Sequence, residues 1–599
     1  MTATDLDTTT EIAASVGRAG RRRHRPRPLW LVVPGVAFLA VFLLYPAVQL
    51  LSLGFQDANS GEWSLAAFRR IFGVSVYLRV LSTTFAIAAE TTAFSLLLAY
   101  PLAYWLNRLS GRRQRLVTLL VLLPFWTGAL VKNFAWLVLL GRTGIAATVM
   151  AWLGLPPTDL LFSRATVLFG MTHTMLPLAV VTMLPVMSRI DPRLMPTAAT
   201  LGASSAEAFW RVFFHLSVPG VAAAGLLVFI GSLGFFITPS LLGGPQDTML
   251  GQVVILQINQ MQNWPFASAL AGLLIVSALV ACFAFDQMFG LSAVTGSARP
   301  TRRGRGFARR VGLALLGALA DGSRIGTELV GRLTGGHRFR WLLPLYAWTI
   351  VALLVLPIAA LLPMAFTSGK FLSFPPPGFG LAWIRDYFAS PVWMAATLRS
   401  FLVGLVTALV TLLMTVPAAL GLSQTTSRFK TAVFLLFLAP MVVPSIVVAI
   451  ALFYLFAHIS LVATDLGIVI GHTVMAMPVA FIIMMTVLKS YDWQLNLAAG
   501  TLGANRFQVF MRVTAPLLKG ALSAAFIFAF LNSFEELTIA MFVGGGLKST
   551  LPKQMWDDVT LQVSPTLAAA SVFVVLVVFA LFILAEFVRP RPAARARDQ

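Results

Sequence analysis

Apolar residues fall in blocks of roughly 20 along this chain, the length that an α-helix needs to cross the hydrocarbon core of a bilayer. Short polar or basic stretches separate the blocks. The pattern predicts an all-α membrane protein with about twelve transmembrane helices. We expect them at residues 30–53, 79–104, 116–139, 165–187, 220–242, 265–289, 341–366, 396–423, 432–458, 464–488, 519–541 and 564–588.

The blocks form two tandem sets of six, over residues 30–289 and 341–588. Two stretches carry the repeat most clearly: "TAATLGASSAEAFWRVFFHLSVPG" begins at Thr197 and "LAAGTLGANRFQVFMRVTAPLLKG" begins at Leu497. Gly202 of the first and Gly503 of the second lie 301 positions apart. Because each set holds an even number of spans, both sets cross the membrane in the same direction. We therefore expect two six-helix bundles related by a parallel pseudo-two-fold repeat.

Composition supports a membrane protein, because 58% of the residues are hydrophobic and only 11% are charged. Soluble domains carry about a quarter charged residues. The net charge of +22 comes from 44 Lys and Arg, most of which fall on one side of the predicted membrane. Such a bias marks the cytoplasmic side. It predicts a cytoplasmic N-terminus (1–29), linker (290–340) and tail (589–599). The basic balance is then topological, and we expect no nucleic-acid partner.

The linker between the halves contains the apolar stretch "VGLALLGALA" at residues 311–320. The stretch is too short to span a bilayer and follows two arginines, Arg309 and Arg310. Two interpretations remain open: an amphipathic helix lying in the membrane interface, or a flexible charged linker with an apolar patch.

The repeated stretch lies between the fourth and fifth helices of each half, on the predicted cytoplasmic side. Small residues precede each glycine, and we expect Gly202 and Gly503 to adopt positive φ in a sharp turn. A second short helix with aromatic residues should follow, and Pro219 and Pro516 should break the chain before the next span. Exposed aromatic residues need a cover, either the protein's own bundle or a partner. Two copies at one topological position favour a partner with two sockets.

The second copy resembles the "EAA" coupling loop of ABC-importer permeases, whose pattern is Glu-Ala-Ala, then a Gly and a later Pro. Leu497-Ala498-Ala499, Gly503 and Pro516 fit the pattern, with Leu in place of Glu. The first copy fits more loosely, through Pro196-Thr197-Ala198 and Gly202. Further stretches, "LLPFWTGALVKNFAWLVLLGRTGI" from Leu122 and "NSFEELTIAMFVGG" from Asn532, resemble the first and second permeases of spermidine/putrescine-type importers.

This resemblance implies the transmembrane domain of a type I ABC importer in the bacterial inner membrane, with both permeases fused in one chain. It implies a cytoplasmic ATPase dimer that binds the ATP, an extracytoplasmic solute-binding protein, and no cofactor in this chain. The residues expected to couple to the ATPase are Ala198, Leu201, Gly202, Ala203, Phe209, Arg211, Ala498, Ala499, Leu502, Gly503, Ala504, Phe510, Arg512 and Pro516.

Polar residues inside the predicted spans are the candidates for the translocation path, because each buried charge costs a few kcal/mol unless it faces water or a partner. They are Glu90, Lys132, Asn532, Glu535 and Glu536. For Glu90 and Lys132, a mutual ion pair that locks two helices is an equal alternative. The neighbouring Glu535 and Glu536 repel each other, which a passing cation would relieve. Together with the resemblance, they predict a small cationic solute such as a polyamine.

Other functions compete less well. An ABC permease for ferric iron, a phosphonate or an opine is the alternative within the class, and a secondary transporter driven by an ion gradient is the alternative outside it. We find no catalytic arrangement and no metal-binding spacing, and expect His173 and His472 to hydrogen-bond within the bundle. "GGGLKST" at residues 544–550 lacks the glycine that a phosphate-binding loop has directly before its lysine, so the chain is predicted to be a transport subunit and not an enzyme.

Overall fold

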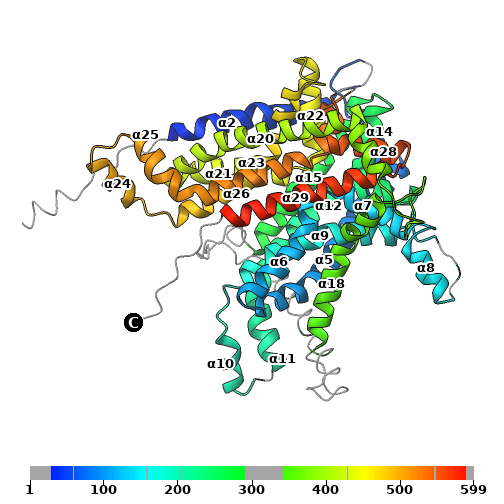
Figure 1. Cartoon of the computed structure of the whole chain (residues 1–599). Coiled ribbons are helices and arrows are strands. Elements are labelled where there is room, and N and C mark those ends of the chain that lie inside the picture. Colours follow the sequence, from blue (N-terminus) through cyan, green and yellow to red (C-terminus); the bar gives the residue numbers. More distant parts are fainter. Residues whose placement is uncertain are drawn as a thin grey trace, which may run out of the picture.

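A computed structural model describes residues 29–289 except 58–59, 155, 157–158 and 204, residues 314, 321 and 325, and residues 341–588 except 426, 428 and 546–547. Over these residues the chain is almost wholly helical (Figure 1). Eleven of the described helices are long and apolar enough to cross a membrane, or twelve when α21 (Lys430–Val442) and α22 (Ser445–His458) count as one bent span. The predicted all-α membrane fold is confirmed.

The two halves repeat the same order of long helices, and half one has additional short helices. In half one the elements are η1 (Leu29–Val32), α2 (Val33–Leu39), η2 (Ala40–Leu44), α3 (Tyr45–Leu53), α4 (Ala66–Gly73), α5 (Ser75–Arg108), α6 (Gly111–Trp126), α7 (Ala129–Leu140), α8 (Ile145–Trp152), α9 (Arg164–Met187), α10 (Leu194–Thr200), α11 (Ser205–Ala208), η3 (Phe209–Phe214), α12 (His215–Leu233), α13 (Ile237–Leu242), η4 (Pro245–Asp247), α14 (Leu250–Asn259) and α15 (Trp264–Phe289). In half two they are α18 (Leu342–Ala365), α19 (Ala382–Ala389), α20 (Pro391–Ser423), α21, α22, α23 (Asp465–Lys489), α24 (Gln494–Thr501), α25 (Arg506–Val509), η5 (Phe510–Thr514), α26 (Ala515–Phe534), α27 (Thr538–Val543), α28 (Leu551–Leu561) and α29 (Thr566–Val588).

The backbone repeats at the level of single residues. Phe162 and Ala463 both have a φ of 58°, although positive φ costs most residues about 1–2 kcal/mol. Gln262 and Val563 form a second such pair, with φ values of 50° and 51°. Each pair is 301 positions apart, the same spacing as Gly202 and Gly503. Costly conformations at equivalent positions are the mark of one duplicated unit.

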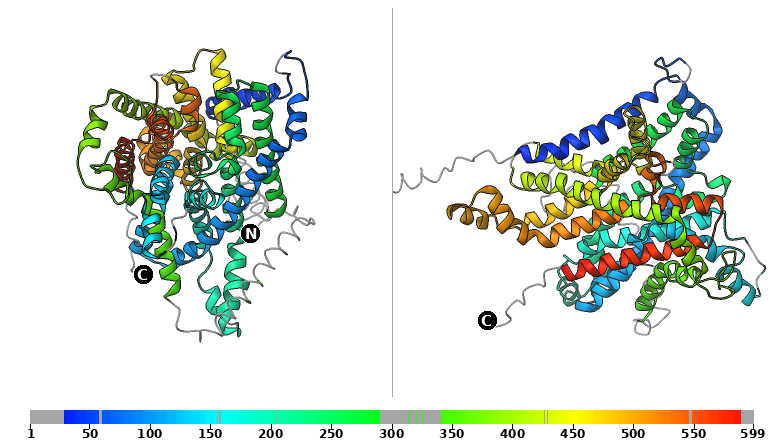
Figure 2. Two further views of the ribbon diagram at one scale, coloured as in Figure 1. Left: turned by 90° about the vertical axis from the view of Figure 1, so that its right-hand side faces the viewer. Right: turned by 45° about the horizontal axis from the view of Figure 1, so that its top comes forward.

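The first helix of each half packs against the other half. The segment from η1 to α3 contacts α20, α21 and α22, and Figures 1 and 2 show it lying along the helices of half two. Reciprocally, α18 contacts α5, α6 and α7. There the Tyr346 hydroxyl donates to the Leu98 carbonyl at 2.8 Å, and the rings of Trp105 and Trp348 lie 5.9 Å apart. The exchange binds the halves into one body.

Several predicted spans are wrong at their ends or broken inside. The third helix of each half is interrupted, between Trp126 and Ala129 in half one and between Val442 and Ser445 in half two, where α21 and α22 meet at 98°. Val443 has extended backbone because it precedes Pro444, and a residue before proline is disfavoured in the helical region. Apolarity continues through both breaks, so the hydrophobic pattern did not reveal them.

The fifth helix of each half also differs from its prediction. We expected spans at 220–242 and 519–541, but α12 ends at Leu233 and α26 at Phe534. The apolar residues that follow belong to the short helices α13 and α27, each reached through a turn. Both spans also begin earlier than predicted, since the helices continue from Phe209 and Arg506. The segments 1–28 and 589–599, and the stretch 311–320 apart from Ala314, lie outside the described residues.

The exchanged first helix generates a stability prediction. A Cβ at Gly35 of α2 would lie 2.6 Å from Cζ of Phe437, whose buried ring stacks on Phe481 at 4.3 Å. We expect Gly35→Ala to lower stability by about 1–3 kcal/mol through overpacking, measured as a lower unfolding temperature in detergent. Gly500→Ala is the matched control, since no heavy atom lies within 4 Å of its added Cβ. Equal unfolding temperatures for the two variants would contradict this packing.

Candidate functional site

The loop between the fourth and fifth helices forms a projecting foot in each half, which we name the first foot (residues 194–214) and the second foot (residues 494–514). Figure 1 shows α10–α11 and α24–α25 extending beyond the other helices. An aspartate precedes each foot, and its carboxylate accepts a backbone N–H two residues later: Asp191 from Arg193 and Asp492 from Gln494, both at 2.9 Å. The same local turn therefore leads into both feet.

The glycine turn of each foot closes its first short helix. Gly202 has a φ of +88° and Gly503 of +87°, so the predicted positive φ is confirmed. The Ala203 N–H donates to the Ala198 carbonyl at 3.1 Å, and the Ala504 N–H to that of Ala499 at 3.2 Å. This is the Schellman arrangement, in which a left-handed residue satisfies the last carbonyls of a helix. It explains six of the residues that the sequence singled out: Ala198, Gly202, Ala203, Ala499, Gly503 and Ala504.

The second part of each foot continues into the fifth helix without interruption. The helix widens into a π segment, η3 or η5, and then runs on as α12 or α26. The expectation that Pro219 and Pro516 break the chain is therefore wrong. Pro219 lies inside α12 and Pro516 at the start of α26, directly after η5. A π segment changes the hydrogen-bond spacing, so the helix continues near residues that cannot donate.

The exposed parts of the feet are chiefly aliphatic. Leu201 and Leu502, at the two turns, are 85% and 88% exposed. In contrast, the ring of Phe209 packs on Tyr104 of its own half at 5.1 Å, and Phe510 is half-buried against the core of half two. The sequence left open whether the bundle or a partner covers the aromatic residues. The bundle covers Phe209, and among the described aromatic residues of the feet Phe507 of the second foot is strongly exposed, at 68%. Arg211 and Arg512 are exposed at equivalent positions.

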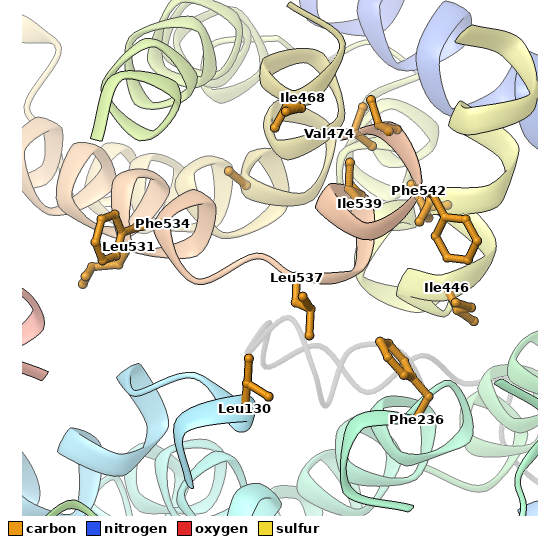
Figure 3. Close-up of a cluster of buried hydrophobic side chains, with 14 of the residues drawn as sticks. Leu130, Phe236, Ile446, Ile468, Val474, Leu531, Phe534, Leu537, Ile539 and Phe542 are labelled. Atoms are coloured by element: carbon orange, nitrogen blue, oxygen red, sulfur yellow. The ribbon is translucent and has the colours of Figure 1, made fainter. Parts of the chain in front are cut away.

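The two halves meet at a central cluster of Leu130, Phe236, Ile446 and Leu537, none more than 4% exposed. Leu130 and Ile446 begin the helices after the two breaks, and Phe236 and Leu537 precede α13 and α27. Each half thus contributes the same two positions. Figure 3 shows Leu537 pointing across the junction toward Leu130 and Phe236. Apolar side chains therefore close the junction between the halves at this point.

Reciprocal contacts surround the central cluster. Gly234, the residue directly after α12, meets Pro444 at the break of half two, where a Cβ added to the glycine would lie 2.6 Å from the proline Cβ. Glu535, the residue directly after α26, meets Gly128 at the break of half one, where a Cβ added to Gly128 would lie 3.5 Å from Glu535 Oε2. The end of each fifth helix therefore lies in the broken third helix of the other half.

Lys132 and Glu535 are the charged pair at this junction. Lys132 is only 2% exposed, and its ammonium donates to the Pro124 carbonyl at 2.7 Å, across the break between α6 and α7. It interacts electrostatically with Glu535 of the other half. Among the described residues, Glu535 Oε1 has no hydrogen-bond partner. The same holds for the amide oxygen of Asn532, three residues earlier on α26.

One interpretation of the sequence paired Glu90 with Lys132, and the structure shows that this interpretation is wrong. The Glu90 carboxylate binds both nitrogens of the Arg164 fork, at 2.7 and 3.1 Å, and so ties α5 to α9. Half two ties the equivalent helices, α20 and α23, through Arg399 and Asp465 at 3.0 Å. Sequence reasoning missed Arg164 because the ion pair joins residues 74 positions apart. Glu90 therefore stands apart from the charges at the central junction.

Glu536, the neighbour of Glu535, stabilises the start of a short helix. Its carboxylate accepts the backbone N–H of Ile539 at 2.9 Å and of Ala540 at 3.3 Å, which caps α27. His472 Nε2 lies 3.3 Å from the same carboxylate, and its Nδ1 is 2.7 Å from the Ser533 hydroxyl. His173 instead faces the Leu353 carbonyl of α18 at 3.2 Å. Both histidines hydrogen-bond within the bundle, as predicted.

Two glycines that the sequence analysis overlooked seat the short helices α13 and α27. A Cβ at Gly170 would lie 2.8 Å from Thr238 Cγ2, and a Cβ at Gly471 would lie 2.7 Å from Ile539 Cγ2. The two glycines are 301 positions apart, the common spacing of the repeat. That spacing was the available signal. No group of three or more His, Cys, Asp or Glu side chains in the described part of the chain is placed to hold a metal ion.

Comparison with known proteins finds permeases. The family "Binding-protein-dependent transport system inner membrane component" matches residues 412–593. The chain is 29% identical over 252 residues to the spermidine/putrescine transport system permease protein PotB of Haemophilus influenzae, a match that covers 41% of this chain and 88% of PotB. It is 31% identical over 222 residues to the inner membrane ABC transporter permease protein YdcU of Escherichia coli, covering 35% of this chain and 70% of YdcU.

A solved structure of a bacterial alginate ABC transporter, in complex with an alginate pentasaccharide-bound periplasmic protein, is also similar. Its identity is 19%, its TM-score is 0.38, and the match covers 43% of this chain and 91% of that chain, a likeness too low to carry an argument. PotB and YdcU each correspond in length to one repeated unit of this chain. The chain therefore holds two permease units, and the prediction of a transport subunit rather than an enzyme is confirmed.

The cap on α27 generates a prediction about Glu536. Glu536→Ala removes the acceptor of two backbone N–H groups, and we expect it to lower stability by about 1 kcal/mol. Glu536→Gln keeps an acceptor oxygen and should lose less. The measurement is the unfolding temperature of each purified variant in one detergent. If the alanine variant unfolds no earlier than the glutamine variant, the carboxylate does not cap α27.

Proposed function

Because the chain belongs to the inner-membrane permeases of binding-protein-dependent ABC transporters, we propose that it supplies both permease units of one importer. The first unit is residues 30–289 and the second is residues 341–588, joined by a cytoplasmic linker at 290–340. The N-terminal segment 1–29 and the tail 589–599 are cytoplasmic in this proposal. The clustering of Lys and Arg in these segments supports that orientation.

Each foot binds one subunit of a cytoplasmic ATPase dimer in this proposal. The observation that carries it is the duplicated turn, with the same φ at Gly202 and Gly503 and a strongly exposed leucine at each turn. Exposed leucines of this kind are covered favourably by an apolar socket on a partner. The coupling residues are those predicted from the sequence, with Phe209 and Phe510 holding the feet to the bundle rather than facing the ATPase. An extracytoplasmic binding protein delivers the solute to the opposite side.

Coupling follows from the continuity of each fifth helix. The helix that begins in the second foot runs from Arg506 to Phe534, about 44 Å at 1.5 Å per residue. It ends directly before Glu535 and Leu537 at the central junction. When the ATPase draws the feet together, the same helices displace the residues of the central cluster. A path between the halves then alternates between the two sides of the membrane.

The solute we propose is a small polar cation of the polyamine kind. The relatives named as spermidine/putrescine permeases support this class. The buried carboxylate of Glu535 supports it independently, because a cation satisfies a carboxylate in a low-dielectric site and an anion is repelled. Asn532 and Glu535 line the path in this proposal, with Lys132 opposite. Glu90 and Glu536 serve structure, through Arg164 and the cap of α27.

The glycine turns generate a docking prediction. Valine resists positive φ, at a cost of about 1–3 kcal/mol, so Gly503→Val should release the partner ATPase from purified membranes and reduce uptake. Gly202→Val should be as severe, because the two glycines have nearly equal φ values although the first foot matches the sequence pattern more loosely.

The matched control for docking is Gly500→Val, which adds the same side chain in open space three residues before the turn. It should retain the ATPase. Co-purification of the ATPase with all three variants at the wild-type level, together with normal uptake, would refute the docking claim.

The energy source is a separate prediction. In half one the positions equivalent to Glu535 and Glu536 are Gly234 and Phe235, so no carboxylate repeats at this site to bind a proton in each half. We expect spermidine uptake into vesicles carrying the chain, its ATPase and its binding protein to require ATP. Uptake driven by a pH gradient in vesicles without the ATPase would instead favour a secondary transporter.

A further inference from the structure

Neither of the two charged residues at the central junction, Lys132 and Glu535, has a charged counterpart at the equivalent position of the other half. Lys132 lies three residues after the start of α7, and the equivalent position in α22 is Val448. Glu535 directly follows α26, and the residue that directly follows α12 is Gly234. Half one has thus acquired an ammonium and half two a carboxylate, at facing positions of an interface whose backbone is otherwise repeated.

If Lys132 and Glu535 served to fasten the two halves together, their side chains would form an ion pair. Instead Lys132 Nζ donates to the Pro124 carbonyl of its own half, and the two side chains are not joined by an ion pair or hydrogen bond within the described structure. Glu535 Oε1 keeps a free acceptor site, and so does the amide oxygen of Asn532 one turn earlier on the same helix. An unsatisfied buried acceptor is costly, and these two lie three residues apart at the end of α26, so a donor that reaches them would be bound favourably.

A donor that suits these two acceptors has a defined chemistry. A primary ammonium carries three N–H donors and a positive charge, which suits a carboxylate and an amide oxygen three residues apart on a helix. We propose that Lys132 is a tethered stand-in for the solute: from its place on the Pro124 carbonyl it neutralises Glu535 electrostatically while the path is empty, and it leaves the acceptors of Glu535 and Asn532 to the ammonium of a passing cation. Lys132 is then a specificity-determining residue of the path. The inference rests on the proposed function, an importer of cations.

The stand-in also promotes release. A fixed ammonium beside the site repels the bound ammonium of the solute, so binding stays weak enough for the solute to leave. Without Lys132, the solute would face an uncompensated carboxylate in a dry junction and dissociate slowly. A lysine is suited to this role because its long side chain holds the ammonium on the Pro124 carbonyl, near Glu535 but off its Oε1.

The test uses the chain with its ATPase and binding protein in vesicles, and radiolabelled spermidine as the probe. We expect Lys132→Met to lower the maximal uptake rate roughly fivefold or more, because release becomes slow once the repulsion is lost. Lys132→Arg keeps the charge and should stay near the wild-type rate. In a Glu535→Gln background, where uptake is already reduced, adding Lys132→Met should lower the rate no further, since the acceptor that holds the solute is gone.

If the role of Lys132 is purely structural, the pattern is different. Lys132→Met then lowers the uptake rate by the same factor in the wild-type and Glu535→Gln chains, and it lowers the unfolding temperature. Either result overturns the inference. Lys132→Gln, which keeps hydrogen-bonding groups, replaces the methionine variant if that variant does not assemble with the ATPase. The inference is also overturned if Lys132→Met, or Lys132→Gln in its place, assembles with the ATPase and takes up spermidine at the wild-type rate. If wild-type vesicles import no spermidine, the proposed substrate class fails, whereas wild-type import with an unchanged Lys132→Met rate refutes only the role of Lys132.

Discussion

One mechanical constraint organises this protein: the element that carries each foot and the element that reaches the central junction are the same helix. In half two the helix is unbroken over 29 residues, and in half one it continues from Phe209 through α12. An α-helix does not change length without losing its hydrogen-bond ladder. Movement of a foot must therefore appear at the far end, beside Phe236 or Leu537. The π segments, next to each foot, are where the hydrogen-bond register is already irregular.

The duplication preserves backbone and lets side chains diverge. Positive φ at Phe162 and Ala463, and the glycine turns, recur at a spacing of 301 because they are set by the fold. The charges do not recur, since Glu535 has a glycine as its counterpart. In the proposed mechanism, the repeated scaffold moves both halves together and the unequal lining places one carboxylate and one ammonium in the path. The first helix of each half packs on the other half, α18 on half one and α2 on half two, and so joins the halves.

The sequence was informative wherever one residue fixes a local conformation. Gly202 and Gly503 predicted positive φ correctly, and blocks of apolar residues predicted twelve spans, because chain length and bilayer thickness are linked. It was uninformative where an apolar block conceals a turn, as before α13 and α27, since both sides of the turn are equally apolar. Of the two alternatives for Glu90, the ion pair with Lys132 is wrong, and the sequence did not indicate Arg164 as the partner because it lies 74 positions away, at the start of α9. The cap that Glu536 makes on α27 depends on a helix whose existence the pattern did not show.

Whether the feet control the central junction is tested most directly by labelling Leu537. The chain has one cysteine, Cys282, so Leu537→Cys in a Cys282→Ser background gives a single reporter at a position that is 4% exposed here. The account predicts that a small maleimide labels it slowly in the resting complex and faster during ATP hydrolysis, and that Gly503→Val abolishes the increase. Labelling that is independent of ATP in a complex that transports would contradict the account, as would an ATP-dependent increase that survives Gly503→Val.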